Sequence, residues 1–398
     1  MSESSGGWLG DAESALRAAP STAILPTARA LLAVYVQASE VTLLLADYGH
    51  SVLQPVTHLP HTGTPIPVRE GAPAGRAFSA QAAVLEVTAV PGVVIAHLPI
   101  TVRGDRLGVL SVRMPEPDRE APHVLELAAF ATALGHELIV AERATDLYLQ
   151  ARRRKRLTLA AEMQWQLLPG RGLARQEYAL GAHLEPAYDI SGDNFDWSTT
   201  EDALTLTVTD GQDHGITAAL LTNLTVNALR NARRAGVSLE EQAYLADQAV
   251  YGEYEGRRYA PTLLLRFDLV TGRAHAVDAG SPQLFRLRHG MVERVVFDVQ
   301  MPLGMFEDSE YRAQEFDIEA GDRLILVSSG VHGSASHDGG AFGERALRET
   351  IAAAGRSCPY DAARAVVDGL TQHHSGELPA DAAVVCLDWW GRQTHPEG

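Results

Sequence analysis

The sequence predicts a mixed α/β fold in two domains, of which the second is an α/β sandwich built on antiparallel sheets. The chain has 398 residues, which is enough for two domains that each bury a core. In its second half, most alternating apolar segments are joined by tight turns such as "VTGR" and "RHGM", which connect antiparallel neighbours. Segments 215–235 and 238–252 carry apolar residues at helical spacing, so we expect helices to pack outside the sheets.

Composition excludes several classes of protein. The chain is 46% hydrophobic and 21% charged, as soluble globular proteins are. Its formal net charge of -17 argues against broad nucleic-acid binding and suits a site that collects cations. We find no run of about 18 apolar residues, so we expect no membrane partner. The N-terminus lacks a signal-peptide pattern, and Cys358 and Cys386 are interpreted as reduced core thiols, which together predict a cytoplasmic protein.

The first domain is predicted over residues 21–122, after a flexible leader at 1–20. Residues 27–38 have helical apolar spacing, whereas 40–57 is expected to form two strands joined by a polar turn. The segment 92–114 is typical of a β-hairpin. The result is a helix packed on an antiparallel sheet, of the size of one domain.

Residues 123–168 are predicted to form one long linker helix, broken once at most. Apolar residues recur at helical spacing, Gly135 is the only interior breaker, and Pro169 with Gly170 ends the helix. The basic run Arg152–Arg156 is expected on a solvated helix face, with nucleic-acid binding as the less favoured alternative. A helix of this length predicts a homodimer or a signalling lever between domains.

The second domain is predicted over residues 169–392. Its strands are expected at 203–210, 261–272, 274–280, 283–290, 311–318, 323–330 and 382–390, and its helices at 215–235, 238–252, 342–355 and 359–373. Short connections between strands and helices at the flanks give an α/β sandwich.

Acidic residues stand at the ends of several of these strands. The stretch "YDISGDNFDWS" places Asp193 after a Ser-Gly turn, Asp210 ends a strand before Gly211, and Asp381 precedes the last strand. Carboxylates at strand ends can meet at one sheet edge, and Mg²⁺ or Mn²⁺ prefers such oxygen ligands. Gly211 allows its own backbone to approach a ligand closely. Taken without further context, ordinary turn chemistry is the preferred interpretation of each Asp, because Asp before Gly is common in turns.

The order of segments favours the metal interpretation. The chain reads "AEMQWQLLPG", "LEPAYDISGDNFDW", "LTLTVTDGQDHGITAALL", "PTLLLRFDLVTGRAHAVDAGSPQLFRLR", "MPLGMFEDSEYRAQEFDIEAGDRLILVSSGVHG" and "GAFGERALRETI". Over residues 157–390 this resembles the SpoIIE branch of the PPM-type, metal-dependent serine/threonine phosphatases. The earlier "GAPAGRAF" and "LPITVRGDRLGVLSV" resemble a GAF sensor domain more weakly.

The resemblance implies an α-β-β-α sandwich for the second domain, together with a site and a reaction. One or two Mn²⁺ or Mg²⁺ ions at the sandwich edge would activate a water that attacks a phosphoserine or phosphothreonine of a partner protein, such as a phosphorylated anti-sigma-factor antagonist. Asp193 matches the first metal ligand, and Asp210 matches the ligand that bridges both metals, with the Gly211 carbonyl beside it. Asp196 matches an acid that supports the ligands, and Asp381 is the candidate from the last motif. The GAF-like domain would bind a small ligand of unknown identity.

The chain also departs from the family pattern. Ser329 stands where a ligand Asp is expected, and Ala380-Asp381 replaces a pair of acids whose first member is normally the ligand. Asp213 occupies a usual glycine position, and Ser281 replaces the histidine of an "AGHP" motif. The metal site is therefore expected to be half intact, with reduced activity.

Two hypotheses remain open from the sequence. One is an attenuated metal-dependent phosphatase, and the other is a pseudophosphatase that binds a partner without turnover. Positions 329 and 380 discriminate between them. Asp338 could substitute as a ligand, although an ordinary acidic turn is the preferred interpretation of that residue.

Overall fold

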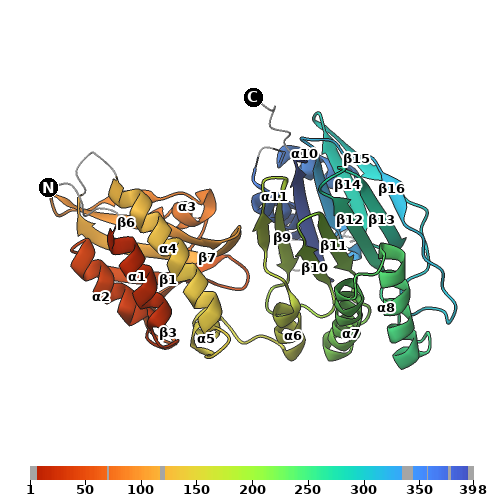
Figure 1. Ribbon diagram of the computed structural model, residues 1–398, viewed down its shortest axis with the longest axis horizontal. Helices are drawn as coiled ribbons and strands as arrows, with labels where there is room; N and C mark the ends of the chain where they lie inside the picture. The colour runs from red at the N-terminus through yellow and green to blue at the C-terminus, as the bar shows by residue number, and fades with distance from the viewer. Residues whose placement is uncertain are drawn as a thin grey trace. The chain divides into compact units, whose positions relative to one another are not determined.

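The chain folds into two compact units. The computed structural model describes residues 7–69, 71–116, 122–333, 344–355, 357–374 and 378–392. Unit 1 comprises Met1–Arg156 and unit 2 comprises Leu157–Gly398 (Figure 1). Asp338 lies outside the described residues.

Unit 1 is built on one antiparallel sheet of seven strands. The strand order is β3-β2-β1-β7-β6-β5, and β4 also pairs with β2. The strands are β1 Glu40–Ala46, β2 Val52–His58, β3 His61–Thr62, β4 Ile66–Pro67, β5 Val84–Val87, β6 Val93–Val102 and β7 Asp105–Pro115. The two expected strands at 40–57 and the expected hairpin at 92–114 are therefore confirmed.

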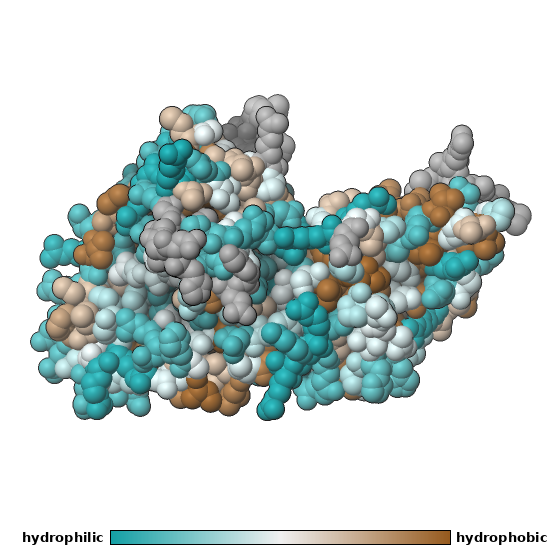
Figure 2. All heavy atoms as spheres, turned by 180° about the vertical axis from the view of Figure 1, so that it is seen from behind, coloured by the Kyte–Doolittle hydropathy of each residue, from teal (hydrophilic) through white to brown (hydrophobic). Residues whose placement is uncertain are grey.

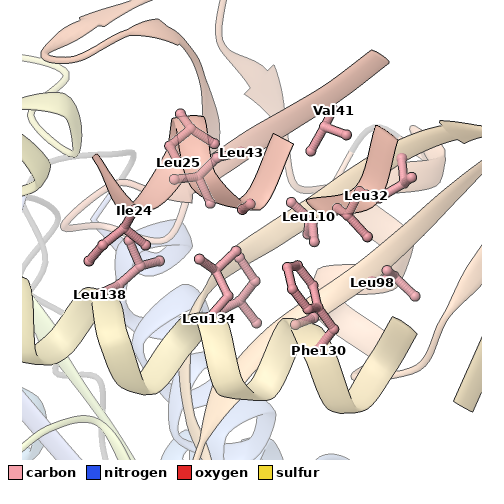
Figure 3. Close-up of a cluster of buried hydrophobic side chains, with 14 of the residues drawn as sticks. Ile24, Leu25, Leu32, Val41, Leu43, Leu98, Leu110, Phe130, Leu134 and Leu138 are labelled. Atoms are coloured by element: carbon pink, nitrogen blue, oxygen red, sulfur yellow. The ribbon is translucent and has the colours of Figure 1, made fainter. Parts of the chain in front are cut away.

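Helices cover both faces of this sheet. On one face lie α1 Gly7–Ala18, α2 Ile24–Tyr35 and α4 Pro122–Ala141, and on the other lies α3 Pro73–Ala80. Figure 3 shows Phe130, Leu134 and Leu138 of α4 directed toward apolar side chains of α2 and the sheet. The expected flexible leader at 1–20 is wrong for residues 7–18, because Ala12 and Leu16 of α1 are fully buried in this core.

The expected single helix over 123–168 is also wrong. It is divided into α4, α5 Leu147–Ala151 and α6 Leu159–Leu167, and α6 belongs to unit 2. After α4 the chain turns back, and Arg152 pairs with Glu142 and donates to the Ala46 carbonyl. The side chain of Arg152 is only 14% exposed, so it does not lie on a solvated helix face. The homodimer was expected from one continuous helix, which the structure divides into three. The homodimer therefore stays a prediction.

Helix α4 is an exception to the expectation that the chain has no apolar run of about 18 residues. Its segment Val124–Ala141 is long and apolar enough to cross a membrane by length and composition alone. In unit 1 its apolar face packs on the sheet, as expected of a core helix. The exposed face of the molecule in Figure 2 is mostly hydrophilic, with separate apolar patches, in keeping with the high net charge.

Unit 2 contains two antiparallel sheets. The first has the order β10-β11-β12-β13-β16, and the second has the order β15-β14-β17-β18-β9-β8. The first comprises β10 Asn194–Thr199, β11 Ala203–Thr209, β12 Thr262–Asp268, β13 Ala274–Ala279 and β16 Gln314–Phe316. The second comprises β8 Gly172–Ala174, β9 Tyr178–Glu185, β14 Gln283–Arg288, β15 Met291–Val295, β17 Arg323–Val327 and β18 Ala382–Trp389.

The two sheets pack face to face and helices cover their outer faces. Phe267 of β12 contacts Trp389 of β18, with ring centroids 5.5 Å apart. Helices α7 Gly215–Arg234 and α8 Leu239–Tyr254 lie on the first sheet, and α10 Glu344–Ala353 and α11 Pro359–His373 lie on the second (Figure 1). A one-turn helix, α9 Ser329–His332, follows β17. The expected α-β-β-α sandwich is confirmed.

The core of unit 1 predicts a clear contrast between two leucines on α4. Leu134 is fully buried and Leu125 is 75% exposed. Leu134→Ala should destabilise unit 1 by about 2–5 kcal/mol, because it removes buried methyl groups and leaves a cavity. Leu125→Ala is the matched control and should change stability by less than about 0.5 kcal/mol.

Hydrogen–deuterium exchange of peptides from 24–141 in the full-length protein measures this difference locally. Equal exchange in the two variants would contradict the packing of α4 on the sheet.

Candidate functional site

Four loops, two from each sheet of unit 2, meet at one edge of the sandwich. The turn Ser191–Asp193 leads into β10 and Asp210-Gly211 follows β11, while Ser329 follows β17 and Asp381 precedes β18. The structure thus brings together Asp193, Asp210 and Asp381. The Asp193 N–H donates to Asp381 Oδ2 at 3.4 Å, and the charges of Asp210 and Asp381 both raise the pKa of Asp193.

Two glycines allow the first two loops to touch. A Cβ added at Gly211 would lie 2.1 Å from the Cα of Gly192, and a Cβ at Gly192 would lie 2.5 Å from the Cα of Gly211. No side chain fits in this contact, so both positions require glycine. The contact lets the Gly211 N–H donate to Asp193 Oδ1 at 2.9 Å.

Asp381 holds the turn before β10 rather than facing a cation freely. Its Oδ2 accepts hydrogen bonds from the backbone N–H groups of Ser191 at 2.8 Å and Gly192 at 2.7 Å. Gly330 packs against it from the other side, since an added Cβ there would lie 1.7 Å from the Asp381 carbonyl oxygen. One of the two carboxylate oxygens of Asp381 is thereby already committed.

Asp210 is held by donors from the positions that depart from the family pattern. The Ser329 N–H donates to Oδ1 and Oδ2 of Asp210 at 3.1 and 3.2 Å. The side chains of Ser281 and Ser329 also lower the pKa of this carboxyl group. Burial has the larger and opposite effect, and it raises the pKa of Asp210 from 3.8 to about 6.

Asp193 carries the clearest sign of a missing counter-charge. It is 3% exposed, and its Oδ2 is buried without a hydrogen-bond partner. Burial first, and then the charges of Asp210 and Asp381, raise its pKa well above the ordinary value. Burial also raises the pKa of Asp381, against the effect of the backbone N–H groups. Three carboxyl groups thus oppose one another's ionisation.

These residues fit one divalent cation better than two. The unpartnered Oδ2 of Asp193, the carboxylate of Asp210 and the carbonyl of Gly211 are hard oxygen donors of the kind that Mg²⁺ and Mn²⁺ bind. Within the described ranges, no group of three or more His, Cys, Asp or Glu side chains is arranged to hold a metal ion. Ser329 and Ala380 supply no carboxylate for a second ion.

The expectation that Asp196 supports the metal ligands is wrong. Asp196 lies inside β10, where it forms ion pairs with Arg230 at 2.7 Å and Arg233 at 2.9 Å. Side chains alternate along a strand, so Asp196 faces helix α7 while Phe195 faces the other sheet. The preceding turn was recognised from the sequence, but the strand that begins at Asn194 was not.

Sequence reasoning also missed polar residues that position the site. Gln164 of α6 is fully buried, donates to the Ser191 carbonyl at 3.0 Å and accepts from Asn194. The Ser328 hydroxyl accepts from Ala383 N–H and lowers the pKa of Asp193. "QWQ" carries no periodic or motif signal that would single out Gln164, and in "SSG" the motif position is Ser329 rather than Ser328. A buried polar residue on an otherwise apolar helix is the one hint for Gln164.

Part of the chain is similar to a known family. Residues 200–390 match the model of the Stage II sporulation protein E (SpoIIE) family. The matched range includes Asp210, Gly211, Ser329 and Asp381, whereas Asp193 lies just before it.

Two curated relatives come from Bacillus subtilis (strain 168). Phosphoserine phosphatase RsbP is 22% identical over 183 residues, which are 45% of this chain and 45% of RsbP. Phosphoserine phosphatase RsbU is 20% identical over 283 residues, 70% of this chain and 83% of RsbU. The match therefore spans less than half the length of RsbP.

Solved structures include two similar chains. The SiaA-PP2C domain of Pseudomonas aeruginosa is 19% identical with a TM-score of 0.49, and the match covers 58% of this chain and 94% of that one. The PP2C phosphatase domain of SpoIIE from Bacillus subtilis is 18% identical with a TM-score of 0.47, covering 55% of this chain and 66% of that one.

The pKa of Asp210 predicts a stability that depends on pH in the absence of metal. The unfolded chain releases this proton near 3.8 and the folded chain near 6, so stability falls as pH rises from about 4 to about 6 and then levels off. A rise from 3.8 to about 6 corresponds to roughly 3 kcal/mol at most. Asp210→Asn should therefore stabilise the metal-free protein at neutral pH and have no such effect near pH 4.

Asp196→Asn is the matched control because it makes the same chemical change at a buried, paired carboxylate. It should destabilise the protein by about 3 kcal/mol or more at neutral pH, since two arginines lose their partner. Urea denaturation of both variants with a chelator present measures the two effects. If Asp210→Asn destabilises the protein to a similar extent at neutral pH, the ionised Asp210 is not unfavourable in the folded protein, and this prediction is wrong.

Proposed function

We propose that unit 2 is a metal-dependent phosphatase that hydrolyses phosphoserine or phosphothreonine on a partner protein, with reduced activity. The observation that carries this proposal is the convergence of Asp193 and Asp210 across the Gly192–Gly211 contact, with a buried oxygen of Asp193 left without a partner. The match of residues 200–390 to the SpoIIE family, and the names of RsbU and RsbP as phosphoserine phosphatases, support it.

The roles of the chain's own residues follow from their contacts. Asp193 and Asp210, with the Gly211 carbonyl, would hold the cation. The chemistry that a bound Mn²⁺ or Mg²⁺ supplies is a coordinated water of lowered pKa and positive charge beside the phosphoryl group. The Ser329 N–H keeps Asp210 oriented, and Asp381 keeps the turn at Ser191–Asp193 in place. Burial of these groups lessens competition from bulk water.

The reduced activity follows from the substituted positions. Ser329 offers a hydroxyl where a charged ligand is expected, Ala380 offers nothing, and Asp381 is bound to backbone N–H groups. With one cation instead of two, less charge is available to stabilise the transition state. The second candidate function is a pseudophosphatase that binds its partner without turnover. The Ser329 N–H favours it, because it donates to both carboxylate oxygens of Asp210 without a second cation.

The wider setting is part of the same proposal. The substrate would be a phosphorylated protein of a bacterial partner-switching pathway, such as an anti-sigma-factor antagonist, in the cytoplasm. Unit 1 would be a GAF-like sensor domain that binds a small ligand and regulates unit 2. A cavity of about 200 Å³ on the α3 face of its sheet supports this idea, and it is lined in part by Leu44, His97 and Arg113.

The first prediction of this proposal concerns activity. The full-length protein should hydrolyse a phosphoserine peptide only with Mn²⁺ or Mg²⁺ present, and Asp210→Asn should lower kcat roughly a hundredfold or more, since it removes a cation ligand. Asp298→Asn changes an exposed acid of the same unit and should leave kcat unchanged. Absence of turnover by the wild type at millimolar Mn²⁺ would favour the pseudophosphatase.

The second prediction concerns the substituted ligand. Ser329→Asp should restore part of the second site, raise the affinity for Mn²⁺ and increase kcat by about tenfold or more. Without metal the same variant should be less stable than the wild type, because the new carboxylate lies beside Asp210. Thr271→Asp adds an equal charge on an exposed turn and serves as the control. A variant with unchanged Mn²⁺ affinity in calorimetry would show that position 329 does not limit the site.

A further inference from the structure

A cavity rich in arginine lies on the outer side of the first sheet of unit 2, under α7. Its volume is about 650 Å³, within the range of small-molecule sites. Four arginines line it: Arg230, Arg233 and Arg234 from α7 and Arg266 from β12. Asp196 is its one acidic lining residue, so the lining carries a net positive charge in a chain of formal net charge -17.

The first two arginines are fixed in place. Arg230 and Arg233 bind Oδ1 and Oδ2 of Asp196, and Arg230 also donates to the Leu167 carbonyl. Both side chains are mostly buried, 17% and 15% exposed. A guanidinium has five N–H donors, and these contacts use only some of them. Two oriented guanidinium groups therefore present further donors to the cavity at little entropic cost.

The other two arginines have no carboxylate partner. Within the described part of the chain, neither Arg234 nor Arg266 forms an ion pair. Arg266 lowers the pKa of Asp268, but that carboxylate accepts the backbone N–H groups of Val270 and Thr271. Residues 230, 233 and 234 share one face of α7 by helical spacing, and the strand register places Arg266 opposite Thr205. Four positive charges thus line one cavity, and Asp196 is the one carboxylate in its lining that offsets them.

We propose that this cavity binds a phosphate-class anion carried on a small organic molecule. Arginine pairs with phosphate through two parallel N–H donors, and such charge-assisted bonds are stronger than neutral ones. Asp196 holds two of the arginines, Arg230 and Arg233, in place through ion pairs. Arg234 and Arg266 supply positive charge that no carboxylate among the described residues pairs with. The hydroxyl-bearing residues Ser198, Thr200 and Thr205 also line the cavity and could bind a polar scaffold.

The cavity is separate from the acidic site. Asp193 and Asp210 lie at one end of the β10–β11 hairpin, and Thr200 and Ala203 of the cavity lie at its opposite end. Asp196, the lining residue nearest to Asp193 along β10, is three residues away, or roughly 10 Å of extended strand. Asp196 also faces α7 rather than the other sheet. The proposal therefore does not depend on the phosphatase activity of unit 2.

Isothermal titration calorimetry of the full-length protein tests the proposal. The chelator EDTA is present throughout, so that no cation can recruit phosphate to the acidic site. The probes are ribose 5-phosphate, inorganic phosphate and ribose. We expect ribose 5-phosphate to bind more tightly than inorganic phosphate, and ribose not to bind. If inorganic phosphate binds equally well, the phosphate group alone is recognised and the organic part of the proposal is overturned.

Two variants connect binding to the cavity. Arg234→Gln and Arg266→Gln should each weaken ribose 5-phosphate binding by about tenfold, because each removes a charged donor. Both residues are exposed and unpaired, so the thermal unfolding midpoint should not change. Arg312→Gln removes the same charge from a site that is 83% exposed and should leave affinity unchanged. The absence of wild-type binding at millimolar ligand, or affinity unaffected by both cavity variants, would overturn the proposal.

Discussion

The candidate site depends on a contact between two pieces of backbone. Gly192 and Gly211 approach so closely that a Cβ on either would collide with the other. Each glycine adjoins an aspartate, so the same contact brings Asp193 and Asp210 together from opposite strands of a hairpin. The closeness of the two carboxyl groups is thus a consequence of backbone packing, and the fold thereby causes their mutual repulsion.

The surrounding groups answer that repulsion unequally. Asp381 accepts hydrogen bonds from the backbone N–H groups of Ser191 and Gly192, and Asp210 accepts one from the N–H of Ser329. Only Asp193 retains a buried oxygen without a donor. A cation would be most favourable at that oxygen. The loop at Ser329 therefore does more than lack a charged ligand, because its backbone N–H donates to both oxygens of Asp210.

The sequence predicted the sandwich well because its signals are local. Alternation marked β11, β12 and β18, and tight turns implied antiparallel neighbours. The errors arose where distant residues decide the outcome. Asp196 was taken for a neighbour of the metal ligands, but its partners Arg230 and Arg233 come from a helix 34 and 37 residues farther along the chain.

The same reason explains the other errors in the sequence interpretation. Residues 1–20 begin with a polar stretch, yet Ala12 and Leu16 are fully buried and Trp8 and Leu9 pack against the same core as α4. The stretch 123–168 has helical spacing throughout, yet the chain turns where Arg152 can reach Glu142 and the Ala46 carbonyl. No glycine or proline lies within residues 142–158 to announce that turn. Propensity was therefore overridden by tertiary contacts.

Strand alternation also explains how one short strand serves two clusters of opposite charge. The turn before β10 places Asp193 among the acids at the edge of the sandwich, and three residues later Asp196 faces α7 and its arginines. An odd separation along a strand reverses the face on which a side chain lies. The sheet between them keeps the arginines from neutralising the acidic site. Asp193 therefore lacks a counter-charge while positive side chains lie on the far side of its own strand, and this separation keeps a place for a cation.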